Sequence, residues 1–284
     1  IQPDISVFGK VKTALAKVIS ESKIQEDKIL VTGIELPGLI NLKKGTNKTY
    51  FPEEENLFEK LQEIFGTRVF FNHDAKIRTF AEQHFGLAHG RKHVLMLQAD
   101  WGLGLGIISN GKLYSGKSGY SGEFGHLPIV DNGVLCNCGK NGCLETAVSA
   151  IAIARMAKEG ISKGSLSLIT ELVNGDLSKI DISVITKAAN LGDQFAISLF
   201  TFAGQWLGRG IAYLVQIFNP ELVIIGGRVA QAKQFILNPV LQSVHTFCNP
   251  EISNDTEIKF SELGEKAATL GIAAYALEKI SMIK

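Results

Sequence analysis

Hydrophobic and polar positions in the first part of the chain alternate between a helical period and short apolar runs. Helical spacing of apolar side chains predicts amphipathic helices in residues 6–22, 55–65 and 75–86. Apolar runs in residues 28–39 and 68–75 predict buried strands. Because helices and strands alternate at short spacing, the pattern predicts an α/β fold with a largely parallel sheet.

The remainder of the chain has a different order of elements. Residues 93–114 contain two apolar runs around a glycine-rich turn, and an Asn-Gly pair near their end is a strong signal for a tight hairpin. Helical periodicity follows in residues 146–207 and 265–280. Between these helical regions, residues 220–230 predict a buried strand that ends in a Gly-Gly turn.

Composition narrows the class of protein. The chain has 284 residues, 45 % of them hydrophobic, which is enough for a large buried core. The net charge is +1, so no basic surface for nucleic acid is expected in this chain. Its start has no secretory signal, and its longest apolar stretch, 195–218, is interrupted by Gln205, Arg209 and Gln216. We therefore expect a cytoplasmic protein without a membrane span.

Three of the four cysteines lie close together in "GHLPIVDNGVLCNCGKNGCLET", residues 125–146. Cys136, Cys138 and Cys143 form a C-x-C-x-x-x-x-C array, and two glycines within it allow the loop to turn. His126 is the natural fourth ligand, and a set of one histidine and three cysteines suits a closed, structural zinc site. The alternative, three unrelated thiols, is disfavoured because the rest of the chain has only Cys248, which we expect in the core.

The order of residues in "SGEFGHLPIVDNGVLCNCGKNGCLE" resembles the signature of the ROK family, which includes repressors and sugar kinases. Three further segments resemble the family: "HDAKIRTFAEQHFG" its segment around the catalytic aspartate, "NPELVIIGG" its nucleotide-side strand and turn, and "TGIELPGLI" its strand ending in Pro-Gly. The resemblance covers nearly the whole chain from Lys28 onward. The cysteine signature is its most specific part.

The resemblance implies an actin-like ATPase (ribonuclease H-like) fold of two lobes with a sugar between them. On that basis we expect a first lobe in residues 1–91, completed by a C-terminal helix in residues 267–284. The second lobe is expected in residues 92–266 and contains the zinc loop, residues 126–143. A homodimer or higher homo-oligomer is expected.

The resemblance also assigns roles to residues that match the family's sugar site. Asp74 corresponds to the base that accepts a proton from a sugar hydroxyl, and Glu123 and Glu145 correspond to sugar-binding positions. Carboxylates suit this role because they accept hydrogen bonds from neighbouring hydroxyls. In the family, His126 both binds zinc and donates to the sugar. His73, before the aspartate, resembles the repressor branch, which senses N-acetylglucosamine, xylose or related sugars.

The glycine-rich turn decides between a kinase and a sugar sensor. Phosphoryl transfer needs hydroxyl and backbone N–H donors around the phosphates of ATP, which binds with Mg²⁺. The kinases of the family have a threonine in this turn, whereas this chain has Asp100 and Trp101 before Gly102 and Gly104. Tryptophan supplies no hydroxyl, and a carboxylate repels phosphate. Together with the Gly226-Gly227 turn, this indicates a degenerate nucleotide side.

The start of the chain bears on the same choice. The chain begins without methionine and lacks the acidic-Gly-Gly-Thr hairpin that should precede residues 6–22, so the first lobe is expected to be incomplete. In the repressors a DNA-binding helix-turn-helix would come before that hairpin. The favoured interpretation is therefore the sugar-sensing part of a transcriptional regulator, binding a sugar or amino sugar here and DNA through a missing segment. The alternatives are an ATP-dependent sugar kinase and a sugar-binding protein with neither activity.

Overall fold

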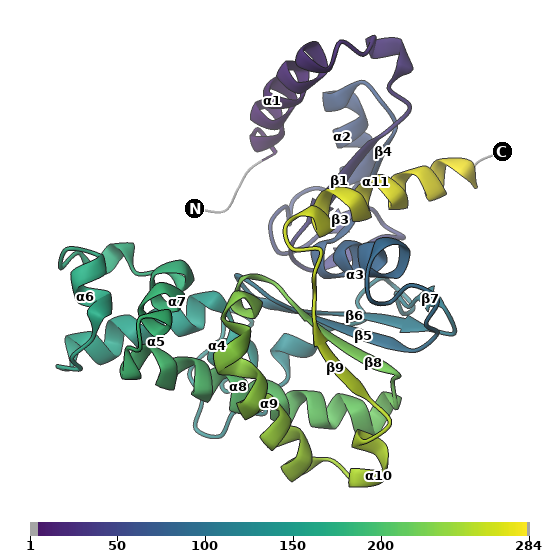
Figure 1. The fold of residues 1–284 in the computed structure, drawn as a ribbon. Helices are drawn as coiled ribbons and strands as arrows, with labels where there is room; N and C mark the ends of the chain where they lie inside the picture. The colour runs from purple at the N-terminus through teal and green to yellow at the C-terminus, as the bar shows by residue number, and fades with distance from the viewer. Residues whose placement is uncertain (1–4, 283–284) are drawn as a thin grey trace. The chain divides into compact units, whose positions relative to one another are not determined.

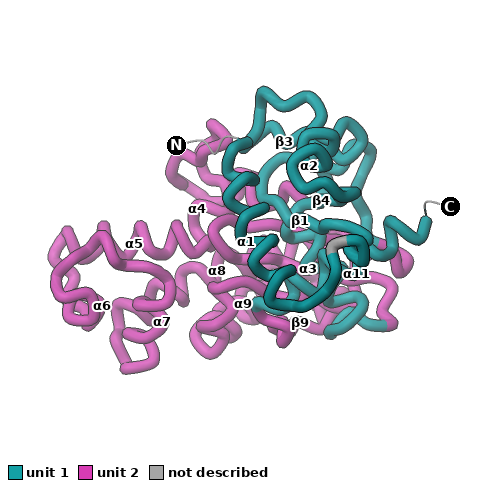
Figure 2. Tube along the Cα trace, turned by 90° about the horizontal axis from the view of Figure 1, so that it is seen from above, with its two compact units in different colours: residues 1–89, 113–121, 265–284 teal, residues 90–112, 122–264 magenta. Residues whose placement is uncertain are grey.

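The computed structural model describes residues 5–282, which form two compact units (Figure 2). Unit 1 is built from Ile1–His89, Leu113–Ser121 and Glu265–Lys284. Unit 2 is built from Gly90–Lys112 and Gly122–Gly264. The chain thus passes between the units four times, and neither unit is a continuous segment.

Unit 1 has a small parallel sheet with helices packed against it (Figure 1). Strand β1 (Thr32–Leu36) pairs in parallel with β4 (Val69–His73), and the short strands β2 (Ile40–Asn41) and β3 (Thr46–Asn47) form a separate pair. The helices of this unit are α1 (Val7–Ser22), α2 (Leu57–Phe65), α3 (Asp74–Phe85) and α11 (Lys266–Ser281), with a short 3₁₀ turn, η1 (Glu26–Lys28). Phe8, Leu57, Leu61 and Phe71 are among the buried residues of its core. The helices and strands predicted in this region are therefore present, each within a few residues of the predicted bounds.

Helices α3 and α11 pack at very short range. Gly271 of α11 lies so close to the backbone carbonyl of Ile77 that a Cβ atom there would collide with the oxygen. One turn farther along α11, the Tyr275 ring packs edge-to-face on Phe80 at 5.7 Å between centroids. The last helix of the chain therefore completes the core of a unit that begins near its start.

The segment Leu113–Ser121 belongs to unit 1, whereas the sequence places it inside the second lobe. Lys76 of α3 is 2 % exposed, and its ammonium group donates a hydrogen bond to the Gly119 carbonyl. Gly119 in turn lies against the backbone of Ile40 and Leu42. These contacts hold the segment in unit 1. They could not be predicted from the pattern of hydrophobic residues in the sequence.

Unit 2 is built on a five-stranded mixed sheet. Its strands are β7 (Lys112–Leu113), β6 (Leu103–Ser109), β5 (Val94–Ala99), β8 (Leu222–Gly226) and β9 (Glu257–Phe260), in that spatial order. Strands β5, β8 and β9 are parallel, and β6 pairs antiparallel with β5 across the glycine-rich turn. The Asn-Gly pair predicted to form a tight hairpin lies between β6 and β7. The carboxyl ends of β5 and β8 therefore lie side by side, with the start of β6 beside them.

Helices cover much of the remainder of unit 2. They are α4 (Glu145–Val148), α5 (Ala150–Ser162), α6 (Leu168–Leu172), α7 (Ile182–Asn190), α8 (Gln194–Phe218), α9 (Lys233–Phe247) and α10 (Pro250–Ser253), with 3₁₀ turns η2 (Glu123–His126), η3 (Leu177–Lys179) and η4 (Arg228–Ala232). The long helix α8 begins after an Asp193 cap, packs against α9 and ends where Asn219 adopts a left-handed conformation. None of the helices in the described part of the chain is both long and apolar enough to cross a membrane.

Candidate functional site

The predicted base lies at the junction of a strand and a helix in unit 1. Strand β4 ends at His73, and α3 begins at Asp74. The Ala75 N–H donates to Asp74 Oδ1 at 2.7 Å, and His73 Nδ1 lies 3.0 Å from the same oxygen. The Asp74 side chain is 33 % exposed, so its carboxylate is fixed by the backbone and still reachable from solvent. The position and the partial exposure both suit a general base.

The four predicted metal ligands come together in unit 2. His126 ends η2, Cys136 and Cys138 lie in the following loop, and Cys143 precedes α4. One donor atom from each residue lies within 4.8 Å of the others, with 3.6 Å between His126 Nδ1 and Cys136 Sγ. Three thiols and an imidazole at this spacing fit the tetrahedral donor set that zinc prefers.

The thiols of this cluster differ in their pKa values. Burial raises the pKa of the Cys143 thiol to about 12, and hydrogen bonding with Cys138 and Cys136 adds to the rise. Burial likewise raises the pKa of Cys136, whereas a hydrogen bond from the Lys140 backbone lowers that of Cys138. A metal ion bound at this cluster would therefore have to displace protons from Cys136 and Cys143, which makes its binding dependent on pH.

Glu123 begins the turn that carries His126. The backbone of this turn is attached to β6, because the Leu105 N–H donates to the Gly122 carbonyl at 3.3 Å. The turn continues through buried Phe124 to His126 and closes with a hydrogen bond from Leu127. Glu123 and His126 are thereby attached to the same strand of unit 2. His126 is one of the four residues His126, Cys136, Cys138 and Cys143, which we term the metal cluster.

Glu145 has a backbone partner of its own. Its Oε2 accepts a hydrogen bond from the Leu103 N–H at 2.9 Å. A Cβ atom on Gly102 would collide with the same oxygen, so a side chain at that position would displace the Glu145 carboxylate. The family resemblance predicts Glu145 as a sugar ligand, but its contact with the glycine turn carries no sequence signal.

The glycine turn between β5 and β6 contacts the turn after β8. Asp100 Oδ1 lies 3.3 Å from Nε of Arg228, and the Arg228 guanidinium lies over the Trp101 ring at 4.3 Å from its centroid. Gly227 has a φ of +90° and lies against the Ala99 carbonyl, where a Cβ atom would collide. The two turns predicted on the nucleotide side are thus in direct contact.

The remaining glycines of the predicted nucleotide side belong to the strands themselves. Gly104 pairs with Gln98 across β5 and β6, and Gly226 is the last residue of β8. Gly226 lies against the Gln98 side chain, with 2.8 Å between a Cβ built on the glycine and Gln98 Oε1. Gln98 is 3 % exposed, and neither polar atom of its amide has a hydrogen-bond partner among the residues that the structure describes. Sequence reasoning identified neither Gln98 nor Arg228.

The predicted residues therefore fall into two sets. His73 and Asp74 lie in unit 1. Unit 2 holds the metal cluster, Glu123, Glu145 and the two glycine turns, and the hydrogen bond from Leu103 to Glu145 joins the region of the cluster to the first of these turns.

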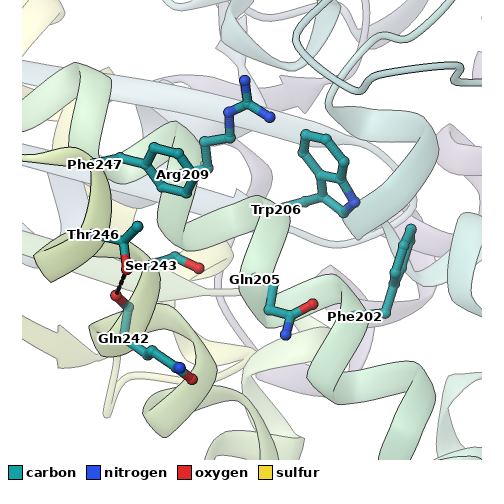
Figure 3. Close-up of a pocket in the computed structure, with 8 residues that line it drawn as sticks. All are labelled: Phe202, Gln205, Trp206, Arg209, Gln242, Ser243, Thr246 and Phe247. Carbon is teal, nitrogen blue, oxygen red and sulfur yellow. Dashed lines mark hydrogen bonds between the residues drawn. The ribbon is translucent and has the colours of Figure 1, made fainter.

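A separate hollow on α8 and α9 contains none of the predicted site residues. Its volume is about 420 Å³, and Figure 3 shows its lining from the two helices. The Arg209 side chain lies between the rings of Trp206 and Phe247, with its guanidinium carbon 5.2 and 5.1 Å from their centroids (Figure 3). Arg209 also forms an ion pair with Asp131 at 3.0 Å. The aromatic rings and the carboxylate together account for this arginine as a packing feature.

Comparison with known proteins finds both sugar kinases and a transcriptional regulator among the relatives of this chain. A glucokinase of Thermotoga maritima is 35 % identical over 252 residues, which are 87 % of this chain and 79 % of that protein. The DNA-binding transcriptional dual regulator NagC of Escherichia coli is 30 % identical over 274 residues, 95 % of this chain and 65 % of the regulator. A crystal structure of a ROK family glucokinase from Streptomyces griseus with glucose and AMPPNP superposes with a TM-score of 0.84 and 28 % identity, over 95 % of this chain and 88 % of that one.

These similarities correct the interpretation favoured by the sequence. The prediction of a regulator's sugar-sensing part is wrong, because the glucokinase shares more identical residues with this chain than the regulator does. One of the grounds for that prediction, the negative charge of Asp100, was considered without Arg228, with which Asp100 is paired in the structure. The sequence profile of the ROK family matches residues 6–279, and the fold is of the predicted actin-like ATPase type. The chain belongs to the ROK family.

Proposed function

We propose that this protein is an ATP-dependent sugar kinase that transfers the γ-phosphoryl group of ATP to a sugar hydroxyl. The observation that carries the proposal is the 35 % identity to a glucokinase over 87 % of the chain. The similarity to a glucokinase crystallised with glucose and AMPPNP supports the same reaction and makes glucose the first sugar to test.

The proposed roles follow from the environment of each side chain. Asp74 accepts the proton of the attacking hydroxyl, since its carboxylate is held by the Ala75 N–H and remains partly exposed. Glu123, His126 and Glu145 bind sugar hydroxyls, and His73 lies beside the base. The hydroxyl oxygen attacks the γ-phosphorus while the bond to the ADP oxygen breaks, so the products are a sugar phosphate, ADP and a proton.

A structural zinc ion is proposed at His126, Cys136, Cys138 and Cys143. Zinc bound there supplies no chemistry to the transfer, because four protein ligands leave no open position on the metal. Its proposed role is to hold the loop between His126 and Glu145 in one conformation. This is supported by the ligand atoms of the four residues, which all lie within 4.8 Å of one another.

The proposed nucleotide side is formed by the turn Asp100–Gly102 and the turn Gly226–Gly227. Both follow the carboxyl ends of neighbouring parallel strands, which is where ligands of α/β sheets bind. The turns present backbone groups, and Mg²⁺ enters with ATP as part of the substrate.

The proposal is tested by coupled assay of ADP release with the full-length protein, MgATP and a panel of sugars that includes glucose, N-acetylglucosamine, N-acetylmannosamine and xylose. Turnover of about 1–100 s⁻¹ with one of these sugars is expected. Reactions without sugar measure background ATP hydrolysis, and mass spectrometry identifies the sugar phosphate. ADP release that does not depend on any sugar, or the absence of a sugar phosphate, overturns the proposal.

A further inference from the structure

Arg228 makes two contacts with the glycine turn that follows β5. Its Nε lies 3.3 Å from Asp100 Oδ1, and its guanidinium is stacked on the ring of Trp101, 4.3 Å from the centroid. Trp101 is 61 % exposed, so the core does not hold this ring in place. The three side chains form a cluster on the surface of unit 2, which we term the Asp100–Trp101–Arg228 cluster.

Hydrogen bonds hold the backbone around the cluster. The Ala150 N–H at the start of α5 donates to the Asp100 carbonyl at 2.8 Å, and the Asp100 N–H donates to the Gly102 carbonyl at 2.9 Å. The Trp101 N–H donates to Asp100 Oδ1, the same oxygen that faces Arg228. The Asp100 carboxylate is therefore oriented by its own turn toward the arginine.

The charge of Asp100 matters because of where the turn lies. A carboxylate without a partner beside the phosphates of ATP would repel them. The pairing with Arg228 makes the turn neutral as a whole, and the stack on Trp101 restricts the guanidinium to the position in which it pairs.

We propose that Arg228 is a positioning residue for nucleotide binding: it neutralises Asp100 and so allows the Asp100–Gly102 turn to accept a nucleoside triphosphate. This inference rests on the proposed kinase function. No contact between Arg228 and substrate is assigned. Nucleotide affinity instead depends on the net charge of Asp100 and Arg228 together.

The inference is tested by removing each charge of the pair separately and then both charges together. The variants are Arg228→Met, Asp100→Asn and the double variant, with Arg228→Lys as the conservative replacement. Arg91→Met is the matched control, because Arg91 pairs with Glu257 at 3.2 Å in the same unit, near the opposite end of the parallel strands. For each protein we measure KM for ATP, KM for the sugar, kcat, and the Kd of MgADP by calorimetry.

We expect Arg228→Met to raise KM for ATP and the Kd of MgADP by about ten-fold, with kcat and KM for the sugar within about two-fold of the wild type. The double variant should return both nucleotide constants to within about three-fold of the wild type. Arg228→Lys and Arg91→Met should each stay within the same limit. Asp100→Asn leaves the positive charge of Arg228 without its partner, so it should lower KM for ATP and the Kd of MgADP. The defect of Arg228→Met should also shrink as salt rises, because salt screens repulsion between like charges.

The outcomes separate this inference from the function on which it rests. A double variant as weak as Arg228→Met overturns the inference, because Arg228 would then contact the phosphates itself. The inference is also overturned if Arg228→Met lowers the melting temperature enough to explain its loss of nucleotide affinity and the double variant does not recover that affinity. If the wild type binds MgADP and the variants rank as expected but no sugar is phosphorylated, the kinase proposal fails and the inference stands for nucleotide binding. A wild type that neither binds MgADP nor phosphorylates sugar overturns both.

Discussion

Leu103 and Glu145 are joined by a hydrogen bond in which the Leu103 backbone N–H donates to Glu145 Oε2 over 2.9 Å. Glu145 begins α4 two residues after Cys143, and Leu103 is the first residue of β6, directly after the Asp100–Gly102 turn. One carboxylate therefore connects the cysteine loop with the glycine turn. The side chain proposed to bind sugar also supports the turn proposed to bind nucleotide.

The double role of Glu145 predicts different effects for two substitutions. Glu145→Gln retains an oxygen that accepts the Leu103 N–H, so KM for the sugar should rise while KM for ATP changes little. Glu145→Ala leaves that N–H without a partner, which costs about 1–3 kcal/mol, so both constants should rise. Steady-state kinetics with each substrate varied in turn measures the effect. Equal KM for ATP in the two variants would show that the hydrogen bond does not support the turn.

The metal cluster predicts about one zinc ion per chain in protein purified without chelators, measured by elemental analysis. Cys143→Ser should lower the melting temperature by more than the roughly 2–4 °C that 1 kcal/mol is worth in a domain of this size, and it should weaken sugar binding as well. Cys248→Ser is the matched control, because Cys248 is also buried but lies outside the cluster. Protein free of metal with full stability would contradict the zinc proposal.

Glu123→Gln should weaken sugar binding by about 1–3 kcal/mol, because an uncharged amide replaces a charged acceptor of hydroxyl hydrogen bonds. The backbone hydrogen bond from Leu105 to Gly122 is unaffected, so the melting temperature should not change. Isothermal titration with the best sugar substrate measures the difference. Glu171→Gln, on α6 of the same unit, provides the control for loss of one negative charge.

Asp74→Asn removes the proposed base and nearly preserves the shape of the side chain. We expect kcat to fall by about 10²–10⁴-fold, the usual contribution of general base catalysis, with a small change in the Kd of the sugar. Rapid-quench measurement of a single turnover shows that the chemical step is the one affected. A variant that retains more than about a tenth of the wild-type kcat would exclude Asp74 as the base.

Two glycines in helices of unit 1 predict opposite effects on stability. Gly271→Ala places a methyl group against the Ile77 carbonyl between α11 and α3, so we expect a loss of about 1–3 kcal/mol. Gly9→Ala in α1 meets no atom within 4 Å, so the better helix propensity of alanine should stabilise the protein by about 0.5–1 kcal/mol. Thermal melts of both variants beside the wild type give the two signs. A neutral Gly271→Ala would mean that the two helices can separate at little cost.

Much of the fold was predictable because its signals are local. Apolar periodicity indicated α1, α2 and α3, and the family motif indicated the ligands of the metal cluster, which lie within one short stretch of chain. Such features depend on residues that are neighbours in sequence, so a pattern along the chain is enough to detect them.

Features that depend on distant residues were not predictable in this way. Asp100 and Arg228 are far apart in the sequence, and only the parallel pairing of β5 with β8 brings their turns together. Viewed without its partner, Asp100 indicated a site that rejects phosphate, and this was one of the grounds for the wrong prediction of function. The hydrogen bond from Lys76 to Gly119, which holds Leu113–Ser121 in unit 1, is another contact without a sequence signal.

The position of α11 has a consequence for synthesis on the ribosome. Unit 1 is left at His89 and re-entered for the last time at Glu265, so α3 has no α11 to cover it while the intervening residues are being made. At about 5–20 residues per second, that interval is roughly 10–40 s. During this time, the surface around Ile77 and Phe80 that later meets Tyr275 is exposed on the nascent chain. Unit 2 can therefore finish folding before unit 1, although synthesis of unit 1 begins first.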